Sequence, residues 1–207
     1  MKQDVYELLT KMKERPSMWL GTAKISLLEA FLNGFDYAQC SQVGQPSAWP
    51  PLWLLTDWTA HKFKQGSSPG WARILTHHCQ GDEAAALHLF FELLEEFKAL
   101  HVVRVVEMEL DAAAYAFYAS EACQVKRYHS TSAGPTPIPA PDALCVIQFS
   151  GGLGYYVFHR QPGQRLAKEA WYASFRACLQ HLRQQFGHTV TWQEAGKLSA
   201  AAITDLL

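Results

Sequence analysis

The residue pattern changes character at His101, and this change constrains the fold of the 207-residue chain more than any other feature. Before it, apolar residues recur at the three- and four-residue intervals of amphipathic helices. After it, Val102-Val103-Arg104-Val105-Val106 has the β-branched composition of a strand. The sequence therefore predicts an α+β fold. We expect a helical domain over 1–101, packed on an α+β domain over 102–207 that holds a small antiparallel sheet and helices.

The helical stripes of the N-terminal half begin at capping residues. Asp4 with Glu7, and Ser26 with Glu29, have the spacing of a capping box, in which two side chains satisfy free N–H groups of the first helical turn. Arg15-Pro16 ends the first stripe, because proline disfavours helical backbone in the residue before it. The helices predicted here cover 4–14, 26–40, a segment around 52–63 and a segment that begins at Gly81-Asp82.

A short apolar block separates the first two predicted helices. It contains Met18, Trp19 and Leu20, and we expect the large side chains to plug the end of a helical hairpin. Gly21 follows the block. We expect it to take a positive φ, which glycine adopts without steric cost.

A β-hairpin is predicted in the C-terminal half. Two apolar runs, 144–149 and 155–159, flank a glycine-rich turn at 151–154. The next apolar residues are Trp171, Phe175, Cys178 and Leu182, at spacings of four, three and four. This spacing predicts a helix over 165–186, which Gly187 ends.

The other segments of this half have weaker patterns. Residues 111–123 are compatible with a helix or a strand, and the proline-rich segment 130–141 is expected to be a loop or an edge strap. Residues 190–192 predict a short strand. A terminal helix is expected over 199–207, with Ser199 as its cap.

Charge and cysteine content restrict the partners and the compartment. The formal net charge of −1 provides no field that would attract nucleic acid or an anionic membrane, so we expect neither as a partner. The five cysteines are scattered and contain no Cys-x-x-Cys pair, which is typical of free thiols in a reducing compartment. With no apolar signal segment at the N-terminus, the sequence predicts a soluble cytoplasmic protein.

No motif in the chain specifies catalytic chemistry. His77-His78-Cys79 lacks the ligand spacing of a zinc site, and Gly151-Gly152-Leu153-Gly154 lacks the lysine and hydroxyl of a phosphate loop. Cys145 and His159 are the remaining candidate, as a thiol–imidazole pair facing each other across the predicted hairpin. We expect buried thiols instead, with no metal and no cofactor, and the sequence favours a protein that is not an enzyme.

Acidic and tryptophan residues are the candidates for contacts with a partner. The acidic stretch is interpreted either as a solvated helix face followed by the outer face of a strand, or as a surface that covers a basic site. The tryptophans are interpreted either as exposed anchors or as residues that pack inward. The candidate partner-binding residues are Trp49, Trp53, Trp58, Glu92, Glu95, Glu96, Glu107, Glu109 and Asp111.

The first hundred residues resemble a group of small bacterial proteins. Residues 15–21 are similar to an Arg-Pro-x-Met-Tyr-Leu-Gly block, with Trp19 in place of the tyrosine. A helix like 27–37, a Gly-Trp-x-x-Ile-Leu element at 70–75 and a Phe-Phe-Glu-Leu-Leu-x-Glu-Phe helix at 90–97 follow in the same order. Members of this group resemble immunity proteins of bacterial toxin systems. The resemblance implies a protein that neutralises a cognate toxin by binding it.

Three functional hypotheses follow. The leading one is an antitoxin-like protein that covers or distorts the active site of a toxin without chemistry of its own. The second is a small hydrolase or modifying enzyme with a site between the two halves, around Cys145, His159 and the His77-His78 segment. The third is an adaptor or chaperone for a secreted effector.

Overall fold

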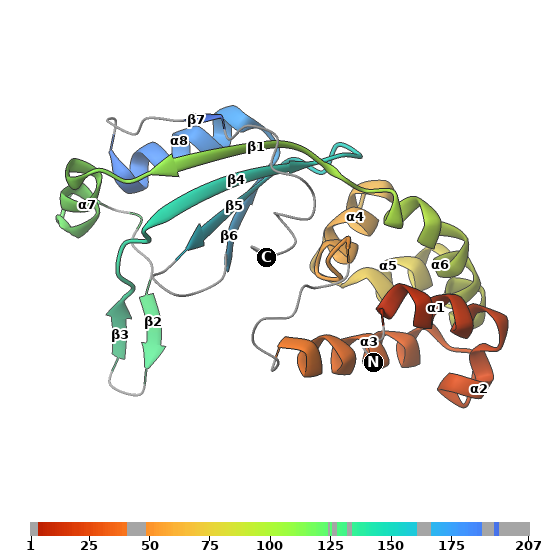
Figure 1. Ribbon diagram of the computed structural model, residues 1–207. Helices are drawn as coiled ribbons and strands as arrows, with labels where there is room; N and C mark the ends of the chain where they lie inside the picture. Colours follow the sequence, from red (N-terminus) through yellow and green to blue (C-terminus); the bar gives the residue numbers. More distant parts are fainter. Residues whose placement is uncertain are drawn as a thin grey trace. The chain divides into compact units, whose positions relative to one another are not determined.

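The computed structural model describes residues 4–40, 49–123, 125, 128–131, 134–160, 167–187 and 193–194. The chain forms two compact units, Met1–His101 and Val102–Leu207, whose boundary falls where the β-branched run begins. The first unit is helical, and the second combines an antiparallel sheet with helices (Figure 1). The predicted α+β fold class is confirmed.

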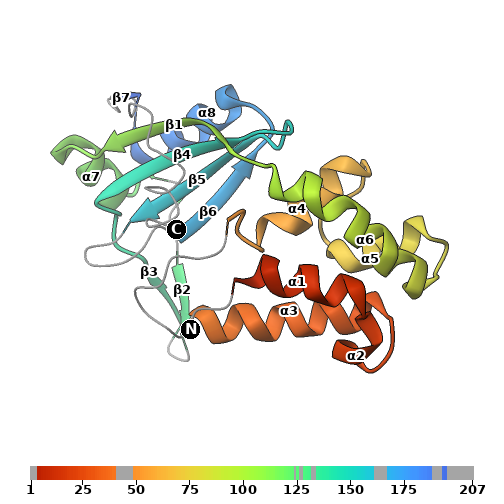
Figure 2. The same cartoon turned by 45° about the vertical axis from the view of Figure 1, so that its right-hand side comes forward.

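The predicted helices of the first unit are all present. Both views place α1 and α3 side by side, with α2 in the connection between them (Figures 1 and 2). The short apolar element that begins at Trp71 is a helix as well. The described helices are α1 (Val5–Glu14), α2 (Pro16–Leu20), α3 (Ile25–Cys40), α4 (Leu54–Lys62), α5 (Trp71–His78) and α6 (Glu83–Lys98).

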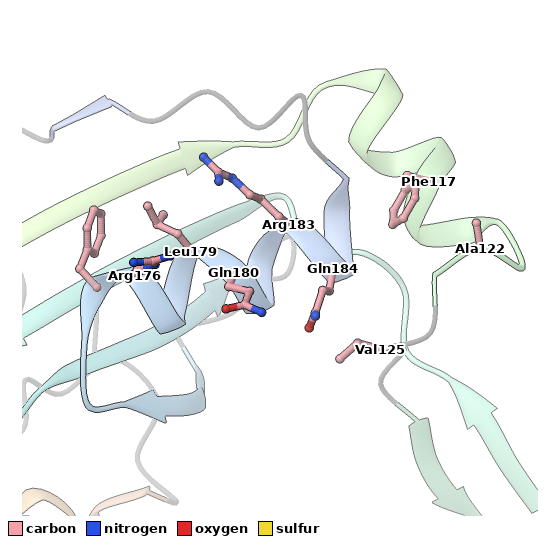
Figure 3. A pocket seen from close by; sticks show the side chains of 9 residues that line it. Phe117, Ala122, Val125, Arg176, Leu179, Gln180, Arg183 and Gln184 are labelled. Carbon is pink, nitrogen blue, oxygen red and sulfur yellow. The ribbon is translucent and has the colours of Figure 1, made fainter.

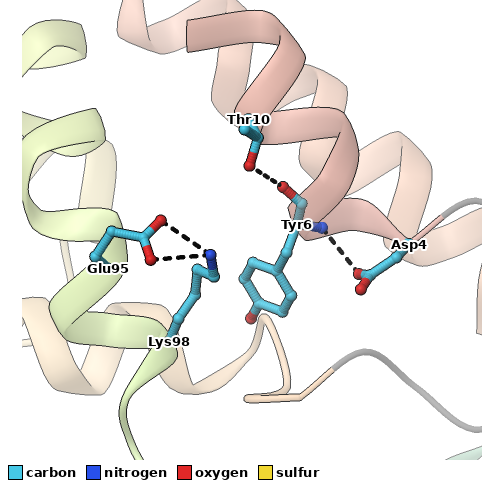
Figure 4. A network of polar contacts seen from close by, with 5 residues as sticks. All are labelled: Asp4, Tyr6, Thr10, Glu95 and Lys98. Atoms are coloured by element: carbon cyan, nitrogen blue, oxygen red, sulfur yellow. Dashed lines mark hydrogen bonds and ion pairs between the residues drawn. The ribbon is translucent and has the colours of Figure 1, made fainter.

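Aspartates cap α1 and α6 as the sequence indicates. The Asp4 carboxylate accepts a hydrogen bond from the Tyr6 N–H at 2.9 Å (Figure 4). Asp82 accepts from the N–H groups of Ala84 and Ala85. Each carboxylate satisfies donors that have no partner within the helix, and each lies at the positive end of the helix dipole.

The second predicted capping box does not form. Ser26 lies inside α3, which begins one residue earlier, so its backbone does not have the extended conformation of a cap. Its hydroxyl and its N–H donate instead to the carboxylate of Glu83, the first residue of α6. Glu29 in turn accepts from the Ala72 N–H of α5. Each carboxylate thus caps a neighbouring helix and ties α3 to the helices beside it.

The apolar block at 18–20 does not plug the hairpin. It forms α2, with Pro16 in its first turn and Gly21 after it at φ +75°, as expected for that glycine. Met18 is 75% exposed and Trp19 is 43% exposed. The prediction was wrong because a five-residue helix points these side chains to the outside of the turn.

The core of the first unit is built from α1, α3, α4, α5 and α6. Trp58 packs edge-on against Phe97, with ring centroids 5.4 Å apart. Tyr6 is buried beside Phe97, and its hydroxyl donates to the carbonyl oxygen of Pro50. Other fully buried side chains are Leu9, Met12, Ile25, Leu28, Leu54, Ile74 and Leu75.

The second unit is organised around a five-stranded sheet in the order β6-β5-β4-β1-β7, and all neighbouring strands are antiparallel. The predicted hairpin is confirmed as β4 and β5. A separate two-stranded ribbon, which begins at Tyr128, overlaps the proline-rich segment 130–141 that we expected to be a loop or strap. The strands are β1 (Val102–Glu109), β2 (Tyr128–Thr131), β3 (Gly134–Pro137), β4 (Ala143–Phe149), β5 (Tyr155–Arg160), β6 (Ala167–Tyr172) and β7 (Gln193–Glu194).

The helix predicted over 165–186 is wrong in its first part. Residues 167–172 form β6, and Ser174 then caps α8 (Phe175–Phe186) by accepting from the Ala177 N–H. The prediction was wrong there because Trp171 precedes Phe175 by four residues, as in a helix, although Trp171 belongs to a strand. Gly187 ends α8 at φ +85°, as predicted. The strand expected at 190–192 and the helix expected over 199–207 lie outside the described residues.

The ambiguous segment 111–123 contains α7 (Ala112–Ala119), which Asp111 caps. α7 and α8 both pack on one face of the sheet. Tyr118 of α7 stacks on Phe186 of α8, with ring centroids 5.4 Å apart. The apolar cluster beneath them contains Val106, Met108, Leu144, Val146, Val157, Cys178 and Leu182. Within the described residues, no helix is both long and apolar enough to cross a membrane.

Gly154, at the end of the hairpin turn, lies close to Trp171 and Tyr172 of β6, and a substitution there tests this close approach. A Cβ at this position would lie 2.5 Å from the Tyr172 carbonyl oxygen and 2.9 Å from Trp171 Nε1, at a φ of +84°. We expect Gly154→Ala to lower the free energy of unfolding by about 3 kcal/mol, since backbone strain and overpacking add. Urea denaturation measures the change.

Gly81→Ala is the matched control. Gly81 has a φ of +94° but no atom within 4 Å of the added Cβ, so only backbone strain of about 1 kcal/mol is expected. Equal losses for the two variants would show that the close approach at Gly154 does not exist.

Candidate functional site

The second unit contains an open groove between α7 and α8. It encloses about 860 Å³ and is lined by residues from α7, from the segment after α7 and from the outer face of α8 (Figure 3). Its apolar residues are Phe117, Ala122, Val125, Phe175 and Leu179, and its polar residues are Arg176, Gln180, Arg183 and Gln184. We refer to it as the α7–α8 groove.

Contacts within the unit hold the aromatic residues of the groove in place. Phe175 packs against the Tyr155 ring at 5.5 Å, and the Arg104 guanidinium lies 4.4 Å from the centre of its ring. Phe117 lies beside the end of α8, where a Cβ on Gly187 would come within 3.3 Å of its ring. Glycine at this position therefore permits close packing as well as the positive φ.

The polar residues of the groove form one stripe along α8. Arg176, Gln180, Arg183 and Gln184 are exposed and follow the i, i+4, i+7, i+8 spacing that places residues on one helical face. Neither guanidinium forms an ion pair with a residue that the structure describes. The described lining contains no carboxylate, so this face presents two cations over an apolar floor.

Sequence reasoning missed this groove. The apolar spacing of the predicted helix marks its inward face, and the polar residues that line the groove from the outward face are two glutamines and two arginines. The one available signal is that 175–186 contains two arginines and no acidic residue. Its second wall comes from a segment more than fifty residues earlier, which the sequence left ambiguous.

The candidate tryptophans belong to the first unit and are engaged there. Trp58 is 5% exposed and packs on Phe97, so it is a core residue and not an exposed anchor. Trp49 is half-buried, and its Nε1–H donates to the Leu100 carbonyl oxygen at 2.9 Å. Trp53 is half-buried. The alternative that these residues pack inward describes Trp58 correctly.

The acidic residues on α6 are exposed and contact lysine or histidine side chains in the same unit. Glu95 pairs with Lys98 at 2.9 Å, as Figure 4 shows. The other two pairs are Glu96 with Lys62 at 2.7 Å and Glu92 with His88 at 3.3 Å. Exposed pairs of this kind contribute about 1 kcal/mol or less to stability.

The candidate acidic residues of the second unit have separate places. Asp111 is exposed, and its carboxylate caps α7 by accepting from the Ala114 N–H at 2.8 Å. Glu107 is exposed on β1. The side chain of Glu109 lies outside the described part of the structure.

The proposed thiol–imidazole pair does not exist. In the β4–β5 register, His159 lies opposite Leu144 and Cys145 lies opposite Phe158. Because side chains alternate along a strand, this one-residue offset places Cys145 and His159 on opposite faces of the sheet. Burial raises the pKa of the Cys145 thiol to about 12. His77 and His78 belong to α5 in the other unit.

His159 is instead part of a buried polar cluster. Its Nδ1 lies 3.7 Å from a carboxylate oxygen of Glu169, and the other oxygen accepts from the side-chain amide of Gln185 at 2.8 Å. Glu169 falls where the pairing of β5 with β6 is interrupted, so its side chain turns toward α8. The prediction of a helix over 165–186 concealed this cluster, because it placed Glu169 on a helix.

A second groove, of about 760 Å³, lies in the first unit among α3, α5 and α6. Its carboxylates, Glu29 and Glu83, are the two residues that cap neighbouring helices. His77 contacts the Gln65 amide across 3.3 Å. The two carboxylates of this groove are therefore engaged in holding the helices, and Arg73 is its other charged residue. Among the described residues, no group of three His, Cys, Asp or Glu side chains is placed to hold a metal ion.

Comparison of the chain with protein-family models, curated proteins and solved structures finds no match.

Thiol reactivity tests the description of the cysteines. Burial raises the pKa of Cys145 and of Cys178 to about 12, and it also raises the pKa of Cys79, but Cys79 keeps part of its surface exposed. At pH 8 a thiol of pKa 12 is a reactive thiolate roughly once in 10⁴ molecules. We expect iodoacetamide to label Cys79 at least tenfold faster than the other two, measured by peptide mass spectrometry.

The denatured protein is the control for this experiment, since all three thiols should react at similar rates in urea. Rapid labelling of Cys145 in the native protein would contradict its burial and would restore it as a candidate nucleophile.

Proposed function

We propose that this chain is an immunity protein, an antitoxin-like protein of the bacterial cytoplasm that binds a cognate toxin and blocks it without catalysis of its own. The observation that carries the proposal is the α7–α8 groove. It presents an apolar floor and two cations that no described residue pairs, which is the composition of a protein-docking surface.

The order of motifs in the first unit supports the same function. The block at 15–21, the helix at 27–37 and the later elements at 70–75 and 90–97 resemble a group of proteins that are similar to immunity proteins. The structure places this block on α2, with Met18 and Trp19 exposed. Exposed methionine and tryptophan are typical of surfaces that bind proteins.

The dimensions of the chain are sufficient for tight binding. A stable complex needs about 800 Å² of complementary surface on each partner, and its energy concentrates in a few aromatic and arginine residues. The α7–α8 groove supplies Phe117, Phe175, Arg176 and Arg183. The acidic residues on α6 remain a predicted second contact, which would require a partner to displace Lys62 and Lys98 from their ion pairs.

Growth of a bacterial host is the test of this function. We expect expression of the gene beside this one in its native locus to stop growth, and co-expression of this chain to restore it. The catalytically inactive form of the toxin should co-purify with this chain, because binding and not chemistry is proposed to neutralise it. A harmless neighbour, or toxicity that this chain does not relieve, would contradict the proposal.

A further inference from the structure

We propose that the α7–α8 groove receives an acidic amphipathic helix of the partner protein. This inference rests on the proposed function in that the helix would belong to the toxin. It names the chemistry of the contact: carboxylates that pair with Arg176 and Arg183, and apolar side chains that cover the groove floor.

The spacing of the two arginines selects a helix. Arg176 and Arg183 are seven residues apart on α8, which is two helical turns and roughly 10 Å along the axis. A second helix that lies along α8 presents carboxylates at the same interval when they are seven residues apart in its own sequence. Both helices then keep their charged residues on the facing side.

The lining between the arginines favours an amphipathic partner. Leu179 is half-buried between the two cations, and Phe117 lies beside the C-terminal end of the helix. Apolar residues three or four positions from each carboxylate of the partner would cover these side chains. Gln180 and Gln184 supply amides that donate to and accept from the polar edge of the incoming helix.

The charges around the groove favour an acidic occupant. α7 contains no charged residue, and α8 contains two arginines, one histidine and no acid. Arg104 lies against the Phe175 ring, so a third cation is close to the floor. Glu121, beside the lining residue Ala122, is the acidic residue nearest in sequence to the described lining. A carboxylate entering this site meets two guanidinium groups that form no ion pair with any residue in the described part of the chain.

Labelled synthetic peptides test the groove without the toxin. The probe is an 18-residue helix-forming peptide with glutamates seven residues apart beside a leucine stripe. Its matched partner carries lysine in place of each glutamate. Fluorescence anisotropy with the full chain gives the Kd of each peptide. We expect the acidic peptide to bind at least tenfold more tightly than the basic one, and high salt to weaken it.

Charge reversal identifies the binding surface. We expect R176E/R183E to raise the Kd of the acidic peptide on the order of 30-fold. The same variant should bind the basic peptide more tightly than the original chain does. K11E/K13E is the matched control, because it makes the same change in net charge on α1 and should keep the Kd within about twofold. R176Q/R183Q removes both charges without adding repulsion and serves as the second variant. Circular dichroism checks that each variant is folded.

The outcomes separate this inference from the proposed function. If the basic peptide or a nucleic-acid duplex binds more tightly than the acidic peptide, the proposal of an acidic helix in this groove is overturned. If R176E/R183E loses the acidic peptide but still restores growth of the poisoned host, the groove is not where the toxin binds, although neutralisation stands. If the original chain binds the acidic peptide through these arginines but restores no growth, the docking site stands and the immunity function fails.

Discussion

The packing of α8 on the sheet is the interaction on which the second unit depends. Cys178, Leu182 and Phe186 face Val106, Val146 and Val157, and Tyr118 of α7 stacks on the same end of α8. The helix is held to the sheet by one face, and the apolar surface buried there supplies most of the favourable free energy of this packing. The opposite face needs no apolar residue for stability. Its arginines and glutamines are therefore available for a contact with another molecule.

In the first unit, the helices are coupled through polar groups as well as through a core. Glu83 accepts from Ser26 at the start of α3, and Glu29 accepts from the start of α5. The hydrogen bond from Ser26 lowers the pKa of Glu83, whereas burial raises the pKa of Glu29. Both residues are thereby committed to the fold. The carboxylates of the α3–α5–α6 groove therefore hold the helices together, whereas the two arginines of the α7–α8 groove form no ion pair with a described residue.

Much of the local structure could be predicted, and the errors have identifiable causes. The helices α1, α3, α4 and α6, the strand β1 and the β4–β5 hairpin follow from periodicity, capping residues and turn glycines. β6 was missed because Trp171 matched a helical spacing by position alone. The Met18–Trp19 plug was wrong because sequence shows that side chains are apolar but not which side of a turn they take. The predicted Cys145–His159 pair was wrong because the strand register is offset by one residue, which puts the two side chains on opposite faces of the sheet.

The sequence by itself determined the fold class, the change from helix to sheet after His101 and the approximate bounds of α1, α3, α4, β1 and the β4–β5 hairpin, because these depend on residues close together in the chain. Only the tertiary structure decided which residues meet. The partners of Glu29 and Glu83 are more than forty residues away, and the groove joins residues of 117–125 to residues of 175–184. Such contacts are set by packing and strand register, which local periodicity does not encode.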